Sequence, residues 1–310
     1  MSVFIETIDT QKYRWIDARF DLKDADWGSQ AFSKEHVKGA IHWDLEQHLS
    51  DMASTEGRHP MPSKEQLTEL FQQAGLELDD AIVIYDQGAS PYAARAWWLL
   101  RYAGFEHAHI SRVGFDALKQ QGIALSATPE AYPRTEIKPQ FDDGLLATRQ
   151  DVKQIVDGTD LGVLIDARSA ERYAGTNEPI DAVAGRIPGA RNYDWAQLVS
   201  AGSFRKDTSF STLLDTKEPA VVYCGSGVTA AALYAALADK QYDNIKLYVG
   251  SYSDWIADED SVVEIDREEH PEAADDRTKA VLAKLIEEGY SGEMLMKKFE
   301  FEKSLLDEKK

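Results

Sequence analysis

The chain has 310 residues, a length that favours two domains, and its 43% hydrophobic and 28% charged residues are typical of a folded globular protein. Its formal charge of −20 disfavours nucleic acid and anionic membranes as partners, so a small anionic ligand would need a local basic pocket. Residues 1–12 lack the apolar core of a signal peptide, and no apolar run approaches the length of a membrane span. We therefore expect a cytoplasmic protein.

Short segments near the start of the chain recur, in the same order, in its second half. The matched pairs are residues 15–19 with 164–168, 39–40 with 189–190, 84–86 with 222–224, and 113–114 with 249–250. The offset is 149 or 150 residues in the first two pairs and 138 and 136 residues in the last two. This shortening places an extra loop in the first copy, within residues 44–63. A repeat of this length predicts two copies of one domain rather than a solenoid.

Each copy has the pattern of alternating strands and helices. In chain order, residues 93–102 predict a helix, and three prolines make residues 126–141 a stiff, extended connection. In the second copy, apolar and β-branched runs at residues 163–165 and 220–223 predict buried parallel strands. Residues 229–240 are rich in Ala and Leu and predict a helix. The alternation predicts an α/β fold in which helices cover both faces of a mainly parallel sheet.

The pattern gives a division into two domains and a tail. We expect domains at residues 1–125 and 147–256, with a linker at residues 126–146. Residues 257–310 lie outside the repeat and form an acidic tail, in which the pattern predicts helices at 275–288 and after Ser291. The tail contains no cysteine, and we expect it to dock rather than to take part in catalysis.

The chain has one cysteine, Cys224, which excludes an internal disulfide and an all-cysteine metal site. It lies between a predicted strand and a predicted helix, where α/β sheets bind ligands. We call the segment that it opens the cysteine loop, which consists of Cys224, Gly225, Ser226, Gly227, Val228 and Thr229. Its glycines allow successive amides to form an anion-binding nest at the helix N-terminus, to which Ser226 and Thr229 add hydroxyl groups. Such a site stabilises a thiolate and makes Cys224 a candidate nucleophile; the alternative is a small, buried, inert side chain.

The first copy and the neighbouring residues limit the chemistry of Cys224. Asp86 takes its place in the first copy, so we expect that domain to be inactive in thiol chemistry. A phosphatase loop needs an arginine six residues after its cysteine, but Ala230 stands there. An acyl-transfer enzyme needs a histidine base, and His270 is the one histidine after residue 125. The remaining chemistry is attack of the thiolate on sulfur, which Cys224 then carries as a persulfide until an external thiol releases it.

Over residues 1–256 the chain resembles the tandem-domain rhodaneses. The resemblance lies in the repeated Asp-Ala-Arg strand ends, residues 187–190 (Ile-Pro-Gly-Ala), the cysteine loop and residues 248–255. The Cys-Gly-Ser-Gly-Val-Thr sequence is similar to that of the 3-mercaptopyruvate sulfurtransferase branch, whereas the thiosulfate branch typically has Arg and Lys in place of Gly225 and Ser226. The resemblance implies two rhodanese-like α/β domains, no metal and no cofactor. It also implies transfer of sulfane sulfur from 3-mercaptopyruvate, through a Cys224 persulfide, to cyanide or to a thiol such as thioredoxin or a low-molecular-weight thiol.

The resemblance also implies roles for individual residues. Arg172 matches the family arginine that binds the donor anion. The mercaptopyruvate branch has a second arginine after a Glu-Pro pair, but here Ile180 follows that pair, and Arg186 is the candidate for the missing charge. In the first copy, His59 and Glu46 resemble residues near the family's pocket and, with Ser226, are candidates for a proton relay. A surface loop position for His59 is the alternative.

Two further functions remain open at this point. The first is a thiosulfate sulfurtransferase with the same persulfide on Cys224. The second, from another class, is a non-catalytic module in which the paired domains hold an anion or a partner and the acidic tail is the working surface.

Overall fold

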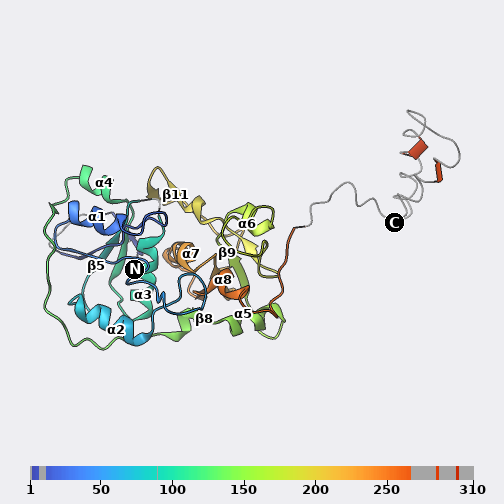
Figure 1. The fold of residues 1–310 in the computed structure, drawn as a ribbon, viewed down its shortest axis with the longest axis horizontal. Helices are drawn as coiled ribbons and strands as arrows, with labels where there is room; N and C mark the ends of the chain where they lie inside the picture. Colours follow the sequence, from blue (N-terminus) through green and yellow to red (C-terminus); the bar gives the residue numbers. More distant parts are fainter. Residues whose placement is uncertain (1, 7–11, 89, 267–283, 286–297, 300–310) are drawn as a thin grey trace. The chain divides into compact units, whose positions relative to one another are not determined.

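The computed structural model of the chain describes residues 2–6, 12–88, 90–266, 284–285 and 298–299. Residues 1–265 form one compact unit and residues 266–310 a second. The helices expected at 275–288 and after Ser291 lie outside the described residues, apart from residues 284–285 and 298–299. All architecture described below belongs to the first unit (Figure 1).

Two five-stranded parallel sheets have the same strand order. The first runs β1-β6-β5-β2-β4, with bounds Phe4–Ile5, Ala108–Ser111, Ile82–Tyr85, Arg14–Asp17 and Ala40–His42. The second runs β8-β14-β13-β9-β10, with bounds Leu146–Ala147, Ile245–Tyr248, Ala220–Tyr223, Val163–Asp166 and Arg191–Asn192. The equivalence confirms the expected duplication and the α/β class.

The central strands are apolar along their whole length because both of their faces are covered. All four residues are buried in β5 (Ile-Val-Ile-Tyr) and in β13 (Ala-Val-Val-Tyr). Each lies between two parallel neighbours, with Tyr85 opposite Asp17 in the first sheet and Tyr223 opposite Asp166 in the second. The parallel arrangement brings the carboxyl ends of these strands to one edge of each sheet, where ligands bind in open α/β folds.

Helices cover both sheets. In the first copy they are α1 (Trp27–Lys34), α2 (Lys64–Gln73), α3 (Tyr92–Tyr102) and α4 (Phe115–Gln120). In the second copy they are α5 (Arg149–Val156), α6 (Ala170–Ala174), α7 (Val228–Asp239) and α8 (Ser251–Trp255). The helices predicted at residues 93–102 and 229–240 are α3 and α7, each of which begins one residue earlier. Smaller elements are η1 (Asp143–Leu145), η2 (Trp195–Leu198) and the strand pairs β3–β7 (His36–Val37, Leu125–Ser126) and β11–β12 (Val199–Ser200, Ser203–Phe204).

Helices α3 and α7 pack against each other where the two copies meet (Figure 1). Both helices are buried along most of their length, which explains why their own residues are mainly small or apolar on every face. The rings of Trp97 and Trp98 each lie 6.3 Å from the ring of Tyr234 across this contact. The two copies therefore share an apolar core instead of being separate bodies on a string.

A buried ion pair marks the same strand end in both copies. Arg19 donates to Asp17 with a shortest distance of 2.6 Å, and Arg168 donates to Asp166 at the same distance. The hydroxyl of Tyr85 also donates to Asp17, at 2.7 Å. Because the copy without the cysteine has the pair as well, the pair holds the strand end in place in both domains and is a feature of the fold.

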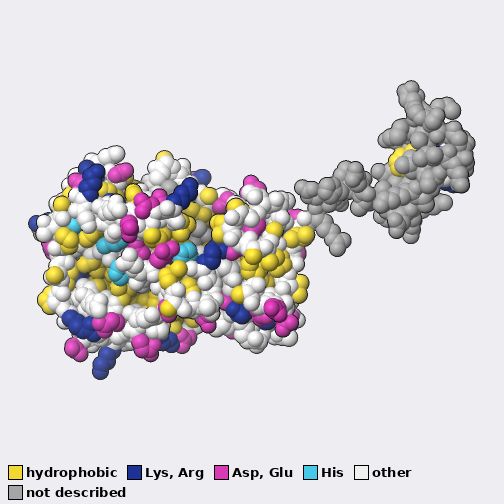
Figure 2. Space-filling view, in the orientation of Figure 1, with side chains coloured by type: hydrophobic (Ala, Val, Ile, Leu, Met, Phe, Trp, Pro, Cys, Tyr) yellow, Lys and Arg dark blue, Asp and Glu magenta, His cyan; other side chains and the backbone are white. Residues whose placement is uncertain are grey.

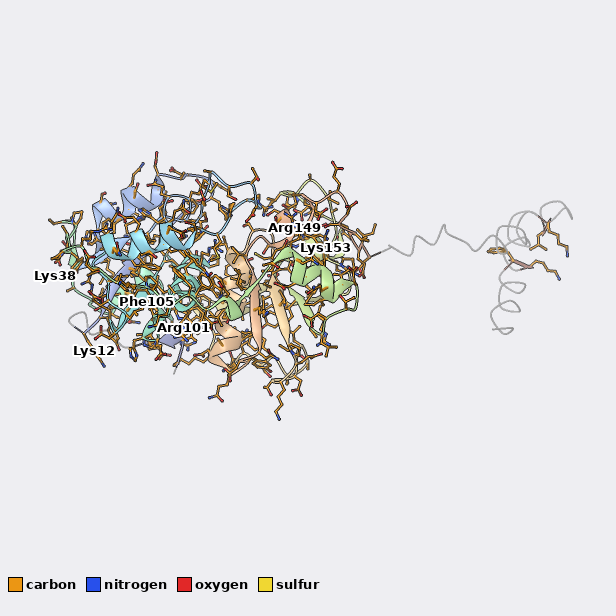
Figure 3. The ribbon with its side chains drawn as sticks, turned by 90° about the horizontal axis from the view of Figure 1, so that it is seen from below. Lys12, Lys38, Arg101, Phe105, Arg149 and Lys153 are labelled. Atoms are coloured by element: carbon orange, nitrogen blue, oxygen red, sulfur yellow. The ribbon has the colours of Figure 1, made fainter. Side chains whose placement is uncertain are left out.

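The connection between the domains packs along the first copy. Arg134 makes a paired contact with Glu69 of α2, and the guanidinium of Arg14 lies 3.5 Å from the ring centre of Tyr132. After β8 the second copy continues with α5, whose Arg149 and Lys153 both pair with Asp258 and so lie on one side of the helix (Figure 3). On the face shown in Figure 2, acidic and basic side chains of the first unit are interspersed. Every described helix is too short or too polar to span a lipid bilayer.

Candidate active site

Cys224 follows the last residue of β13 and is only 2% exposed. Its backbone amide donates to Oγ of Ser251 at 3.1 Å, and the amide of Gly227 donates to its Sγ at 3.1 Å. Gly227 is also the N-cap residue of α7. The sulfur is thus held at the N-terminus of a helix, where a backbone N–H and the helix dipole favour negative charge.

Two glycines give the cysteine loop its shape for different reasons. Gly227 has φ +77°, and a Cβ there would lie 2.3 Å from the carbonyl oxygen of Val249. At Gly225 the close neighbours are side chains instead: a Cβ would lie 2.5 Å from Nη2 of Arg58 and 3.2 Å from Nη2 of Arg172. Gly227 therefore permits the turn, whereas Gly225 leaves room for two guanidinium groups against the loop.

The start of α8 holds the backbone of the cysteine loop from the other side. The amide of Tyr252 donates to the carbonyl of Cys224, and the amide of Ser253 donates to the carbonyl of Gly225, both at 2.9 Å. Ser251, which accepts from Cys224, has φ 56°, a left-handed conformation that is uncommon outside glycine. Sequence reasoning missed Ser251; its one signal is a polar residue directly after the Val-Gly pair that both copies share.

A loop from the first domain completes the site. The amide of Arg58 donates to Oγ of Ser253 at 3.1 Å, and Gly57 is so close that a Cβ there would lie 2.8 Å from the carbonyl oxygen of Gly250. Next along the chain, Nδ1 of His59 lies 2.8 Å from Oγ of Ser226. The extra loop expected within residues 44–63 therefore reaches the cysteine loop of the other domain. It places His59 beside Ser226, instead of on the surface.

His59 is 8% exposed, and burial is the main cause that lowers its pKa to about 4, with smaller effects from Arg95 and Arg58. The imidazole is therefore neutral at pH 7. A neutral imidazole can accept a proton at one ring nitrogen while the other carries one, so the His59–Ser226 pair can pass a proton.

Arg95 of α3 supports this loop from inside the first domain. It is fully buried, and its Nη2 donates to the carbonyls of Leu49 at 3.1 Å and of His59 at 3.3 Å. Its Nη1 has no hydrogen-bond partner in the described part of the chain. Burial lowers the pKa of Arg95 to about 10, and the attraction of Cys224 opposes that shift. A fully buried cation of this kind fixes the path of the loop, because its N–H groups need those carbonyls.

Two carboxylates hold the arginines that lie at Gly225. Glu178 accepts from Nε of Arg172 at 3.0 Å, and Asp181 accepts from Nη2 of Arg172 at 2.8 Å. The other oxygen of Asp181 pairs with Nη1 of Arg58. Burial is the largest effect on Arg58 and lowers its pKa, while Cys224 acts in the opposite direction. The guanidinium of Arg58 therefore lies within the electrostatic reach of the sulfur.

Two residues that the sequence placed at this site make other contacts in the structure. The guanidinium of Arg186 pairs with Glu264 at 2.5 Å and lies 4.2 Å from the ring centre of Tyr173. A backbone bridge between Arg186 and Glu264 fixes this direction, so Arg58 supplies the second cation in its place. Glu46 donates its amide to Asp44, and its side chain makes no hydrogen bond or ion pair with the relay candidates within the described chain.

The corresponding loop of the first domain is closed by its own side chain. Asp86 accepts from the amides of Gly88 at 2.8 Å and of Ala93 at 3.1 Å, and so satisfies the N-terminus of α3. Burial raises the pKa of this carboxyl group to about 7. The carboxylate takes up the amides that could otherwise bind an anion. Within the described residues, no group of three or more His, Cys, Asp or Glu side chains is arranged to hold a metal ion.

The fold and the site define a two-domain α/β protein with one cysteine at a helix N-terminus, at the joint between the domains. The family model described as "Rhodanese-like domain" matches residues 2–121 and again residues 148–258. The chain belongs to the rhodanese family, in its tandem-domain form, as the sequence predicted.

Relatives with names of both donor classes resemble the chain. It is 36% identical over 253 residues to the probable 3-mercaptopyruvate sulfurtransferase of Pseudomonas aeruginosa, which covers 78% of this chain and 89% of that protein. It is 35% identical over 250 residues to the putative thiosulfate sulfurtransferase SseB of Mycobacterium tuberculosis, with 78% and 87% covered. The crystal structure of the 3-mercaptopyruvate sulfotransferase SseA from Escherichia coli has a TM-score of 0.69 and 28% identity, and covers 82% of this chain and all of that one.

Proposed function

We propose that this protein is a sulfurtransferase that takes the sulfur of 3-mercaptopyruvate onto Cys224 as the sulfane sulfur of a persulfide and passes it to an external thiol. The observation that carries the proposal is the convergence on the cysteine loop of Arg58 and Arg172, with the His59–Ser226 pair on the same loop. The arginines are suited to the donor carboxylate, and the polar pair is suited to the proton that the leaving group needs.

In the first half-reaction, the Cys224 thiolate attacks the sulfur of mercaptopyruvate. A sulfur–sulfur bond forms, the carbon–sulfur bond breaks, and the electron pair leaves on carbon as pyruvate enolate. The enolate takes one proton to become pyruvate, and Ser226, bonded to neutral His59, is the donor at hand. The amide of Gly227, which donates to Sγ, holds the cysteine sulfur in place for the attack.

In the second half-reaction, an acceptor thiolate attacks the outer sulfur of the persulfide and leaves Cys224 as the thiolate again. We propose thioredoxin, a low-molecular-weight thiol or cyanide as the acceptor. The chain has one cysteine, so no second thiol of its own can resolve the persulfide. A reducing compartment keeps a lone thiol free, and we propose the cytoplasm as the location.

We also propose a division of labour between the parts of the chain. Residues 147–256 carry the nucleophile, and residues 1–125 lack one because Asp86 replaces it. Residues 126–146 are the linker, and residues 257–310 are a tail with no catalytic role.

The test of the function is the variant Cys224→Ser. We expect sulfur transfer to fall by more than about a thousandfold, because a hydroxyl is far less acidic than a thiol. Mass spectrometry of the wild-type protein after addition of mercaptopyruvate should show one added sulfur, since the chain has one cysteine. Turnover in the serine variant, or an unchanged mass in the wild type, would contradict the mechanism.

Thiosulfate as the donor is the second candidate, and the name of the mycobacterial relative favours it. Side-by-side measurement of kcat/KM with the two donors decides between them. A higher value for thiosulfate would replace the donor and leave the Cys224 persulfide in place. A non-catalytic module would form no persulfide with either compound.

A further inference from the structure

Asp181 lies between the two arginines of the donor pocket. One of its oxygens pairs with Arg58 and the other with Arg172, and its side chain is only 3% exposed. The side chains of Arg58 and Arg172 are more accessible, at 32% and 15%. A carboxylate of the protein therefore already occupies the position shared by the two cations.

The nitrogens that remain for a ligand are few. Nε of Arg172 donates to Glu178, and Nη2 of Arg172 donates to Asp181. Nη1 of Arg58 pairs with Asp181 as well. Among the described residues, neither Nη1 of Arg172 nor Nη2 of Arg58 makes a hydrogen bond, and both lie within 3.5 Å of the position that a Cβ on Gly225 would take. One nitrogen from each arginine thus faces the cysteine loop and remains to donate to the oxygens of a ligand carboxylate.

The charges in this corner are nearly balanced before any donor binds. Three guanidinium groups and three carboxylates are linked by ion pairs: Arg58, Arg168 and Arg172 with Asp166, Glu178 and Asp181. The buried Arg95 is a further cation within the electrostatic reach of Cys224, and the thiolate of the proposed mechanism would balance it. A donor with one negative charge leaves this pocket with a small excess charge, and a donor with two leaves it with twice as much.

We propose that Asp181 determines which donor charge the pocket prefers. Its carboxylate cancels part of the positive charge of the Arg58–Arg172 pair, so the pocket favours monoanionic carboxylates over dianions such as thiosulfate. Asp181 is a specificity-determining residue that acts through the two arginines and does not touch the reacting sulfur. The inference deepens the proposed function and rests on it for the identity of the donors.

A binding measurement that needs no turnover tests the inference. Iodoacetamide, a neutral reagent, alkylates the one cysteine of the full chain, and a bound anion slows that reaction. The probes are pyruvate, a monoanion, and sulfate, a dianion. In the wild type, we expect pyruvate to protect Cys224 at concentrations at which sulfate does not. In Asp181→Asn, the sulfate concentration needed for half protection should fall by about tenfold, and that for pyruvate by less than about threefold.

Two further variants separate charge from shape. Asp181→Ala removes the same charge without the amide, so it should shift the sulfate-to-pyruvate ratio as Asp181→Asn does. Asp181→Glu keeps the charge and should keep the wild-type ratio. The matched control is Asp207→Asn, which changes the net charge equally in an exposed ion pair with Arg205 and should leave both values unchanged.

The outcomes distinguish this inference from the proposed function. A wild-type ratio in both Asp181→Asn and Asp181→Ala, or a shift in Asp181→Ala alone, overturns the role of Asp181 and leaves the persulfide mechanism intact. A shifted ratio without persulfide on Cys224 supports the charge role and contradicts sulfur transfer. In turnover, the ratio of kcat/KM for thiosulfate to that for mercaptopyruvate should rise by about tenfold in Asp181→Asn. If Asp181→Asn does not fold, Asp181→Ala and Asp181→Glu carry the same comparison.

Discussion

Gly225 contributes to the donor pocket by having no side chain. The ends of Arg58 and Arg172 take the space that a Cβ would fill, so two cations from distant segments lie against the cysteine loop. The sequence signals Arg172 through its family position. Arg58, in contrast, is one of many charged residues in a polar loop, and its place depends on how the first domain docks. Asp181 was missed for the same reason, since its partners come from two different domains.

The variant Gly225→Ala tests this view of the loop. We expect KM for mercaptopyruvate to rise by about tenfold, because the new methyl group would lie 2.5 Å from Nη2 of Arg58 and must displace it. Stability should change by less than about 1 kcal/mol, since the end of an arginine can move. The comparison is Gly227→Ala, which meets a backbone oxygen at 2.3 Å with φ +77° and should destabilise the fold by more than about 2 kcal/mol. Steady-state kinetics and thermal unfolding measure the two effects; equal effects of both variants on stability would contradict this reading.

His59 gives the protein a pH dependence with a definite sign. Its pKa is about 4 in the folded state, whereas a free histidine side chain has a pKa of 6.5. Between these values the unfolded chain binds a proton that the folded protein does not, so stability falls as the pH decreases from 6.5 to 4. The loss is on the order of 3 kcal/mol for a shift of this size.

The variant His59→Gln removes this contribution. Asp86, whose pKa is raised to about 7, acts in the opposite direction, because its stability cost grows as the pH rises from 3.8. The difference in the free energy of unfolding between variant and wild type cancels the part due to Asp86. We expect that difference to change by about 3 kcal/mol across the window, in favour of the variant at low pH. Chemical denaturation at a series of pH values measures it, and a constant difference would show that His59 is not buried as a neutral ring.

At the scale of elements, composition predicted those that are buried on all sides. Helices α3 and α7 are rich in small and apolar residues, and strands β9 and β13 in β-branched and apolar residues, because each is covered by both sheet and helix. Short elements such as α8 carry no such pattern; their form depends on contacts, as with the amides of α8 that bind the cysteine loop. The break in the repeat offset did predict the long loop of the first copy. The contacts of that loop with the second domain could be found only in the structure.

Arg95 links that loop to α3, and Arg95→Lys tests the link. An ammonium group cannot reach both the Leu49 and the His59 carbonyl in the geometry of a guanidinium. We expect a loss of stability of about 1–3 kcal/mol and faster hydrogen exchange of amides near residues 49–59. Arg134→Lys, which changes an exposed ion pair with Glu69, is the control and should change stability by less than about 1 kcal/mol. Unchanged exchange near the loop in a destabilised Arg95→Lys would mean that Arg95 supports only α3.

At the scale of the whole molecule, the duplication predicted two copies of one α/β domain, but by itself it did not show how the two copies meet at the site. The family resemblance grouped His59 with Ser226 as relay candidates, and the contact between them across the domain boundary became visible in the structure. Arg186 was misplaced because its partner, Glu264, lies beyond the end of the repeat, where the family pattern gives no information.

A truncation after Ile265 tests the role of the tail. The residues that build the donor pocket and the relay all lie in the first compact unit, so we expect the truncated chain to keep kcat/KM within about threefold of the full chain. A second truncated chain, which ends after Trp255, also lacks Glu264. Its stability should be lower by about 1–3 kcal/mol, because the buried Arg186 loses its ion-pair partner. Loss of turnover in a folded chain that ends after Ile265 would place the tail in the active site.

The loop that carries Arg58 and His59 has a consequence for how the two copies stay together. In the proposed mechanism the catalytic centre is in effect that of a heterodimer, in which one subunit supplies the thiol and the other supplies a cation and an imidazole. Because a covalent connection joins the subunits, a high effective concentration replaces the affinity that free partners would need. The apolar core that the two copies share therefore need not supply the affinity of free partners, and loss of the first copy would remove a cation and an imidazole from the cysteine loop of the second.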